Sequence, residues 1–211
     1  MKYLRISVIT LILWGMCITL PIKAQSKKGL RTNVLVETPI YTVSYNEVLQ
    51  QPNWLEYTSS NRPKKVDRGN MDFKIYNGVY TSNRADYYKN IYDKGHLAPA
   101  ATFSDSWKNL SSTFYYLNCA LQNQDLNRGE WRLLEQQERI WDDSEDLTIT
   151  VNLVFKKGHK VLRTGGHVPS DMIKHIYFVE RGSWKCFEFK NVKPTKGWED
   201  HEVIHTHGLV N

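Results

Sequence analysis

The nine residues Tyr92–Ala100, YDKGHLAPA, place three ionisable side chains around a single glycine and then continue with small apolar residues. Two interpretations fit this pattern. The first is an ordinary surface turn at Gly95. The second is a site that directs the imidazole of His96 at a phosphate group. The rest of the sequence has to decide between them.

The first 24 residues have the composition of a secretory signal peptide. Lys2 and Arg5 form a short basic start, an apolar run covers 6–20, and Ala24 supplies a small residue at the expected cleavage site. The apolar run is shorter than the roughly 20 residues that span a bilayer, so a membrane anchor fits less well. We therefore expect a signal peptide at 1–24 and a secreted or periplasmic protein that is free of the membrane after cleavage.

A lipoprotein anchored at Cys17 also fits less well, because Met16 stands before the cysteine where a small residue is needed. Cleavage lowers the formal charge from +6 to +3, because the leader carries three basic residues and no acidic one. A mildly basic chain permits a polyanionic partner but does not require one. The remaining 25–211 has the length of a single domain.

Composition favours an ordered protein with a substantial core. The chain is 41% hydrophobic and contains 7 tryptophans, 12 tyrosines and 7 phenylalanines, which argues against disorder. Cys119 and Cys186 remain after cleavage. They can form a disulfide in an oxidising compartment or stay as two buried thiols, and the sequence leaves both alternatives open.

Hydrophobic patterning predicts a mixture of strands and helices. We expect strands at 40–45, 115–121, 147–155, 173–180 and 184–189, a strand pair around an Asn-Gly turn at 73–80, and helices at 107–114 and 127–141. The elements lack the regular alternation of a βαβ pattern, which favours an α+β fold over a doubly wound sheet.

The segment 127–141, NRGEWRLLEQQERIW, predicts a helix with two different faces. Leu126, Leu133 and Ile140 fall on one side, and Leu134 and Trp141 widen this apolar stripe. The second face carries an amide, a ring, a carboxylate and a guanidinium, from Asn127, Trp131, Glu135 and Arg139.

Ordinary helix chemistry also explains parts of this pattern. Asn127 followed by Glu130 is typical of a helix N-cap with an acid three residues later. Glu135 and Arg139 are four residues apart, which suits a salt bridge on a helix surface. These alternatives stay open.

His96 and the second helix face together suit metal-assisted hydrolysis of a phosphodiester. Asn127 offers a hard oxygen ligand for Mg²⁺, which keeps several waters because it dehydrates reluctantly. Glu135 can hold one of those waters, and the planar guanidinium of Arg139 matches phosphate oxygens. Neutral His96 can take a proton from the attacking water.

Two blocks of this sequence resemble the DNA/RNA non-specific endonuclease family. Asp93-Lys94-Gly95-His96 followed by LAPA resembles the DRGH signature of that family. Its second block is matched in order and spacing by YLN at 116–118, QDLNRG at 124–129, Trp131 and LE at 134–135. The resemblance covers roughly 71–169. It implies a ββα-metal core, also called a His-Me finger, on a mainly antiparallel sheet with flanking helices.

The resemblance also implies the activity, which is hydrolysis of DNA and RNA that leaves a 5′-phosphate. The implied cofactor is Mg²⁺, with Mn²⁺ as a substitute. His96 matches the general base, and Asn127 matches the sole direct protein ligand of the metal. Glu135 matches the acid that orients metal-bound water, and Arg139 matches the arginine near the scissile phosphate.

Four further residues are expected to bind substrate or hold the shape of the site. Asp93 matches the first letter of the signature, Asn118 matches an asparagine near the site, and Arg68 loosely matches an upstream arginine. Lys94 stands where the family has arginine. Lysine keeps the charge but lacks the bidentate fork, so we expect weaker phosphate binding there.

The segment 201–205, HEVIH, matches the HExxH pattern of zinc proteases. Val203 and Ile204 favour a strand over the helix that this pattern needs, and only six residues follow His205. We therefore expect a surface or edge strand rather than a zinc hydrolase.

The principal alternative to a nuclease is a catalytically weak nucleic-acid-binding protein of the same fold. Lys94 in place of arginine favours this alternative, whereas the intact set of His96, Asn127, Glu135 and Arg139 favours the enzyme. The sequence leaves the oligomeric state open, with a homodimer among the alternatives.

Overall fold

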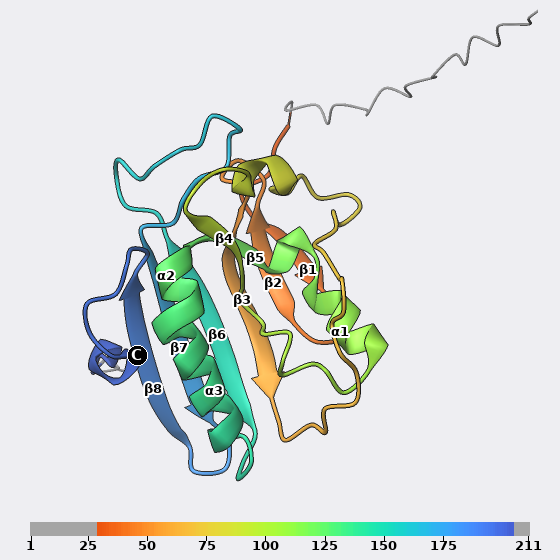
Figure 1. The fold of residues 1–211 in the computed structure, drawn as a ribbon, viewed down its shortest axis with the longest axis vertical. Coiled ribbons are helices and arrows are strands. Elements are labelled where there is room, and N and C mark those ends of the chain that lie inside the picture. The colour runs from red at the N-terminus through yellow and green to blue at the C-terminus, as the bar shows by residue number, and fades with distance from the viewer. Residues whose placement is uncertain (1–28, 205–211) are drawn as a thin grey trace, which may run out of the picture.

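A computed structural model describes residues 29–204, which form a six-stranded sheet, a two-stranded sheet and three α-helices (Figure 1). The large sheet has the order β1-β2-β3-β6-β7-β8, and each neighbouring pair is antiparallel. Its strands are β1 (Val34–Glu37), β2 (Thr42–Asn46), β3 (Gln51–Ser59), β6 (Leu147–Val154), β7 (Asp171–Phe178) and β8 (Ser183–Lys190). The expected α+β fold on a mainly antiparallel sheet is confirmed.

The second sheet and the helix that follows it form a ββα unit. β4 (Tyr92–His96) pairs antiparallel with β5 (Cys119–Asn123), and α2 (Gln124–Leu126) begins at the next residue. The helix continues through a π-helical turn, Asn127–Trp131, into α3 (Arg132–Trp141). Figure 1 shows α2 and α3 lying across β6, β7 and β8 of the large sheet.

The long connection between β4 and β5 contains α1 (Trp107–Thr113), which confirms the short helix expected there. Ser106 caps this helix by accepting a hydrogen bond from the backbone N–H of Asn109 at 3.2 Å. In Figure 1, α1 lies on the β1–β2 side of the sheet, and the ββα unit lies between α1 and the β8 edge.

The long helix begins at Asn123 rather than at Asn127. The side-chain oxygen of Asn123 accepts hydrogen bonds from the N–H groups of Asp125 (3.0 Å) and Leu126 (3.3 Å), which is N-cap geometry. Asn127 therefore lies one turn inside the helix, so its interpretation as the cap is wrong. Gly129, with φ −102° and ψ −112°, interrupts the regular helix and produces the π-helical turn around Asn127.

The face that α3 buries differs in part from the predicted apolar stripe. Leu134 is fully buried as expected, but Ile140 is 61% exposed. Trp131, assigned to the polar face, is fully buried, and its ring centre lies 5.5 Å from that of Phe189. Glu138 is also fully buried. A carboxylate thus replaces apolar side chains at the centre of the interface.

Glu138 is buried because it forms an ion pair with a lysine of the sheet. Nζ of Lys174 in β7 lies 2.7 Å from Oε1 of Glu138, and both side chains are fully buried. The hydroxyl of Tyr57 in β3 donates to Oε2 of Glu138 at 3.0 Å. Nζ of Lys174 also lies 4.2 Å from the ring centre of Trp131. One buried polar cluster therefore joins α3 to β3 and β7.

Four of the five predicted strands correspond to β2, β6, β7 and β8 with ends shifted by a few residues. The fifth, at 115–121, is divided into a 3₁₀ turn at Tyr116–Asn118 and the strand β5. The strand pair expected at 73–80 is wrong, because Lys74 makes only an isolated bridge to Tyr115.

The central strand β3 was missed by the sequence patterns, as were β1 and β4. β3 contains Pro52 and Asn53, which are signals for a loop. The strand is nevertheless held on both sides, by β2 and by β6.

The two cysteines are free thiols, and both are buried. Of the two alternatives that the sequence left open, a disulfide and two buried thiols, the structure has the thiols. None of the helices within residues 29–204 is long and apolar enough to cross a bilayer. The expected signal peptide at 1–24 lies outside the described residues, as does His205 of the HExxH pattern. His201 ends a 3₁₀ turn, Trp198–His201, and not the helix that a zinc protease uses.

Removing one partner of the buried ion pair should strongly destabilise the fold. We expect Lys174→Met or Glu138→Gln alone to lower the free energy of unfolding by about 3–5 kcal/mol, because either change leaves a buried polar group without its partner. The double variant should recover much of this loss, since glutamine still offers an oxygen to Tyr57. Urea unfolding at neutral pH measures all three.

Lys185→Met is the matched control, because Lys185 pairs with Glu202 at the surface. It should change stability by less than about 1 kcal/mol. Equal losses for Lys174→Met and Lys185→Met would show that the buried pair has no special role.

Candidate active site

His96 is the last residue of β4 and lines a wide cleft beside the ββα unit. This cleft, called here the central cleft, has a volume of about 550 Å³. Its polar lining residues are Asp67, Arg68, His96, Ser104, Asn127, Arg128, Arg132 and Glu135. The residues predicted as base, metal ligand and water-orienting acid therefore meet in one cavity, as does Arg68, whose alignment was loose.

Gly95 allows β4 to approach β5 closely enough to place His96 there. A Cβ atom at Gly95 would lie 2.2 Å from Oε1 and 2.6 Å from Cβ of Gln122, distances that no side chain tolerates. The glycine of the motif is thus required by close approach rather than by a turn. The interpretation of the motif as a surface turn is wrong, because it forms a strand.

The His96 imidazole lies among aromatic rings. The ring centres of Phe73 and Phe114 are 4.6 and 5.0 Å from that of His96. Burial, together with the nearby charge of Arg68, lowers the pKa of His96 to about 3. Its Nε2 is buried and has no hydrogen-bond partner among the described residues. The imidazole is therefore neutral at physiological pH and has a free nitrogen, as a proton acceptor requires.

Asn118 holds the backbone that follows His96. Its Oδ1 accepts a hydrogen bond from the N–H of Ala98 at 2.7 Å, and its Nδ2 donates to the carbonyls of Ala98 and Thr113 at 2.9 Å each. The side chain is fully buried. With both polar atoms engaged by the backbone, Asn118 positions the segment that follows β4.

Asp93 fixes the orientation of Asn127 across the ββα unit. Oδ2 of Asp93 accepts a hydrogen bond from Nδ2 of Asn127 at 3.0 Å. The same carboxylate receives two hydrogen bonds from Arg128, at 2.8 and 2.7 Å. Burial alone would raise the pKa of Asp93, but the hydrogen bonds from Arg128 and Asn127 outweigh it and lower that pKa. Because a carboxylate only accepts, the amide nitrogen must face Asp93, which leaves Oδ1 of Asn127 to bind a cation.

Glu135 lies one helical turn past Trp131 and faces the central cleft. Desolvation raises the pKa of its carboxyl to about 7, with a contribution from the buried carboxylate of Glu138 and against the opposing charge of Lys174. A carboxyl group whose pKa lies near neutral pH is suited to exchanging protons with water.

Arg139 does not line the central cleft. It lies in a smaller adjacent cavity of about 210 Å³, called here the Arg139 hollow. None of the ion pairs within 29–204 joins Arg139 to Glu135, so the surface salt bridge considered for this spacing does not form.

Lys94 lines a third cavity on the other side of His96, together with Arg68, Asp93 and Asn127. Its ammonium forms a short ion pair with Asp72. The pair, through its hydrogen bond, lowers the pKa of Asp72. Lys94 is therefore engaged by a protein carboxylate, and its charge is less available to a phosphate than a free arginine fork would be.

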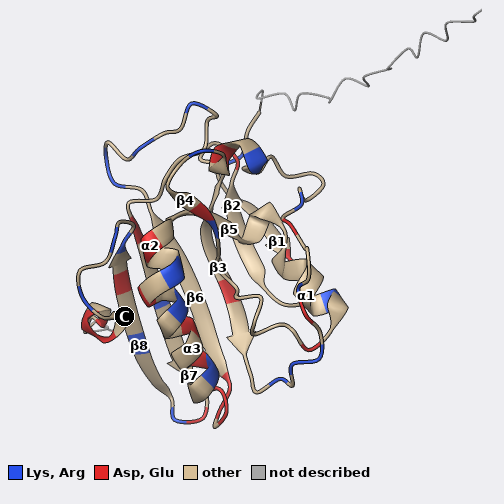
Figure 2. Cartoon of the chain, in the orientation of Figure 1, with Lys and Arg blue, Asp and Glu red and all other residues tan. Residues whose placement is uncertain are grey.

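Two cations of the central cleft, Arg128 and Arg132, were not assigned a role from the sequence. Both follow Asn127 on the same helix and line the cleft. Figure 2 shows the resulting blue bands on the helix, interleaved with red ones. The spacing of Arg128 from Asp93 gave no signal, because the contact depends on the pairing of β4 with β5.

The polar groups of the central cleft fit an ion that takes few protein ligands. No group of three or more His, Cys, Asp or Glu side chains within 29–204 is placed to hold an ion. Structural zinc sites need such a group, whereas Mg²⁺ is bound by one or two oxygen ligands and keeps its waters. Oδ1 of Asn127 and the carboxylate of Glu135, which line the same cleft, match the few oxygen ligands that Mg²⁺ needs.

Comparison with known proteins gives a consistent result. Residues 22–197 match the model of a family described as DNA/RNA non-specific endonuclease. The chain is 33% identical over 107 residues to the mitochondrial nuclease EXOG of Danio rerio, covering 47% of this chain and 31% of that protein. It is 28% identical over 171 residues to a nuclease of Serratia marcescens, covering 77% of this chain and 61% of that protein.

It is also 38% identical over 85 residues to the mitochondrial endonuclease G of Homo sapiens, covering 37% of this chain and 29% of that protein. The matches thus span less than two thirds of each relative. A solved structure of an EndoG/EndoGI complex has a TM-score of 0.72 at 22% identity, covering 81% of this chain and 80% of that one. This likeness confirms the fold.

Glu135→Gln should stabilise the metal-free protein in a pH-dependent way. The folded pKa of Glu135 is about 7, above the ordinary value of 4.5, so folding disfavours its ionised form. The resulting loss of stability begins as pH rises above 4.5 and is complete above 7. We therefore expect no difference near pH 4 and a gain of up to about 3 kcal/mol at pH 8 for the variant.

Urea unfolding in EDTA at several pH values measures this difference. Glu37→Gln removes an exposed carboxylate from β1 and is the control. A Glu135→Gln variant whose stability follows that of Glu37→Gln at every pH would contradict the raised pKa.

Proposed function

Because the chain belongs to the DNA/RNA non-specific endonuclease family, we propose that it hydrolyses phosphodiester bonds of DNA and RNA with the help of a divalent cation. The observation that carries this proposal is the convergence of His96, Asn127, Glu135 and Arg68 on one cleft. An unpartnered neutral imidazole, an oriented amide oxygen, a carboxylate and a guanidinium supply the functions that such a reaction needs.

We assign His96 the role of general base. Its free Nε2 takes a proton from water as that water attacks phosphorus. The low pKa of His96 keeps the imidazole unprotonated before the reaction, and the approach of a phosphodiester anion favours the protonated form that follows. Attack by water rather than by a 2′-hydroxyl is compatible with both DNA and RNA.

The other residues bind and orient. Arg68 is placed to bind phosphate oxygens, and its guanidinium lies 5.2 Å from the ring centre of Phe114. Glu135 holds a water in place as a hydrogen-bond acceptor. Asp93 and Asn118 position Asn127 and the end of β4. Contacts of this kind to phosphate carry little sequence information, which suits cleavage without strong sequence preference.

We propose Mg²⁺ as the cation, with Mn²⁺ as a substitute, held by Oδ1 of Asn127. Such an ion supplies positive charge that stabilises the phosphoryl oxygens and the leaving oxygen. The hydrogen bond to Asp93 supports this assignment, because it engages the amide nitrogen of Asn127 and leaves the amide oxygen free of it.

His96→Ala should abolish cleavage of plasmid and of RNA in Mg²⁺. We expect kcat to fall by about 10²–10⁴-fold, the usual contribution of a general base. His159→Ala, which changes a half-buried histidine between β6 and β7 that lines neither the central cleft nor the cavity lined by Lys94, is the matched control and should keep its activity. EDTA should stop cleavage by the unmodified protein. A folded protein that cuts neither substrate with Mg²⁺, Mn²⁺ or Ca²⁺ would refute the nuclease.

Asp93→Asn should raise the Mg²⁺ concentration needed for half-maximal activity by roughly tenfold, because the new amide no longer dictates which atom of Asn127 faces outward. Arg128→Gln is the matched control, since it removes the partner of Asp93 but leaves the hydrogen bond to Asn127. We expect Arg128→Gln to raise KM for DNA and to leave the Mg²⁺ requirement unchanged. The same shift in both variants would mean that the ion pair, not the amide orientation, matters.

The pairing of Lys94 with Asp72 favours a second candidate, a nucleic-acid-binding protein with little turnover. A cleavage assay distinguishes the two functions. A protein that only binds would leave plasmid uncut even at protein concentrations that saturate the plasmid.

We also propose that residues 1–24 direct export and are removed. N-terminal sequencing of the protein from the periplasm or the medium tests this, and a chain that still begins at Met1 would contradict it.

A further inference from the structure

We propose that the Arg139 hollow binds a second phosphate of the nucleic-acid strand, next to the one that is cleaved. This assigns Arg139 to a flanking phosphate rather than to the scissile one. The inference rests on the proposed nuclease function, because it takes the same strand as its ligand.

The first observation is that two buried guanidinium nitrogens in the hollow lack partners. Nη1 of Arg139 and Nε of Arg62 are both buried without a hydrogen bond within the described residues. Both arginines line the hollow. Buried donors in native proteins nearly always have partners, and an unpaired donor on a charged group is especially costly. Two such donors in one cavity indicate an anionic ligand.

Arg62 is held ready for this role. Its guanidinium carbon lies 5.3 Å from the ring centre of Phe103, which is fully buried. Within residues 29–204, its side chain makes one hydrogen bond, a long one of 3.4 Å from Nη2 to the hydroxyl of Ser60. The side chain of Arg62 therefore packs along a ring while its Nε has no partner among the described residues, an arrangement that favours binding of phosphate oxygens.

The hollow carries more positive than negative charge. Lys64 lines it beside Arg62 and Arg139, and the opposing carboxylates are Asp142 and Asp143. Asp142 accepts a short hydrogen bond from Ser59, and desolvation raises the pKa of its carboxyl. None of the three cations is in an ion pair with a carboxylate among residues 29–204. Their charge is therefore available to a ligand.

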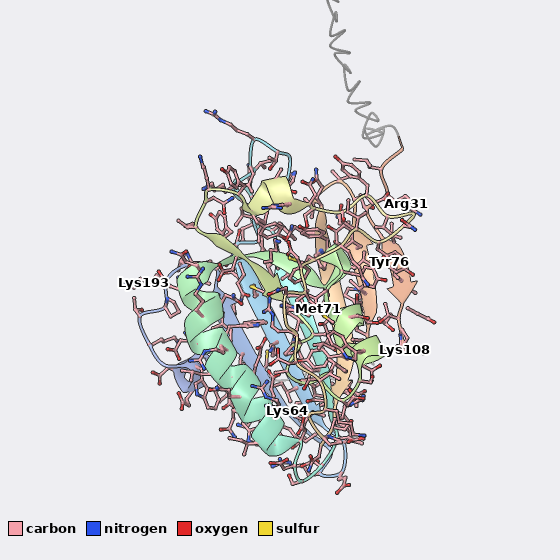
Figure 3. The ribbon with its side chains drawn as sticks, turned by 45° about the vertical axis from the view of Figure 1, so that its right-hand side comes forward. Arg31, Lys64, Met71, Tyr76, Lys108 and Lys193 are labelled. Carbon is pink, nitrogen blue, oxygen red and sulfur yellow. The ribbon has the colours of Figure 1, made fainter. Side chains whose placement is uncertain are left out.

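The hollow also continues the central cleft. Ala101 lines both cavities. The segment 60–72 after β3 contributes Arg62 and Lys64 to the hollow and Arg68 to the central cleft. Figure 2 shows blue segments along this loop, and Figure 3 labels Lys64 and Met71 on it, with Lys64 near the end of α3. One basic segment thus follows both cavities, as a strand with regularly spaced phosphates requires.

The test is binding of a long fluorescent single-stranded oligonucleotide in EDTA, where the metal-dependent reaction cannot proceed. We expect Arg62→Gln to raise Kd roughly tenfold and to reduce the slope of log K against log salt by about 0.7, the value for one lost phosphate contact to a single strand. Lys64→Gln should act in the same direction with a smaller effect. Lys190→Gln removes one exposed charge from β8, outside both cavities, and should leave Kd within about twofold and the slope unchanged.

A general loss of folding would not mimic this result, because the salt slope reports the number of phosphate contacts. Lys64 is exposed and makes no hydrogen bond among the described residues, so Lys64→Gln remains informative even if Arg62→Gln unfolds. Suppose that the unmodified protein binds the oligonucleotide and that both variants keep its Kd and its salt slope. This result would overturn the second phosphate site and leave the nuclease proposal intact. An unmodified protein that does not bind in EDTA would also overturn this inference, whereas the nuclease proposal is decided separately by cleavage in Mg²⁺.

Discussion

The buried ion pair between Glu138 and Lys174 fixes the rotation of α3 on the sheet, and the functional side chains of the helix take their directions from it. At about 100° per residue, rotation that moved Glu138 out of reach of Lys174 would also turn Glu135 away from the central cleft. Such a pair adds little net stability compared with apolar side chains, but only one arrangement of the helix satisfies it. Its contribution is therefore to orientation more than to free energy.

Hydrogen bonds from the ββα unit fix the N-terminal end of the same helix. Asp93 reaches from β4 to Asn127, and Asn123 at the end of β5 caps the first turn. Gly95 lets the two strands approach. His96 and Asn127, the proposed base and cation ligand, are thus held by elements that are contiguous in space. Their separation therefore depends on strand pairing rather than on a mobile loop. Preorganisation of this kind is what electrostatic stabilisation of a transition state needs.

The sequence predicted four polar residues of the central cleft, Arg68, His96, Asn127 and Glu135, and most strands, because the motif blocks and the period-2 patterns are local signals. It could not predict the buried face of α3. Glu138 looks like a surface residue until Lys174, 36 positions later, is brought beside it by β7. The strand β3 was hidden by Pro52 for the same reason, since pairing with β2 and β6 overrides local preference. The separation of Arg139 from the cleft also depends on packing.

The two free cysteines within residues 29–204 have a consequence for how the fold is held together. Cys119 lies in β5 and Cys186 in β8, and neither is linked to another residue. Burial raises the pKa of both thiols, to about 11 for Cys186, so each resists oxidation at neutral pH. The fold of residues 29–204 is therefore indifferent to the redox state of its surroundings. A reducing agent has no covalent cross-link to break in this part of the chain, which packing and hydrogen bonds alone hold together.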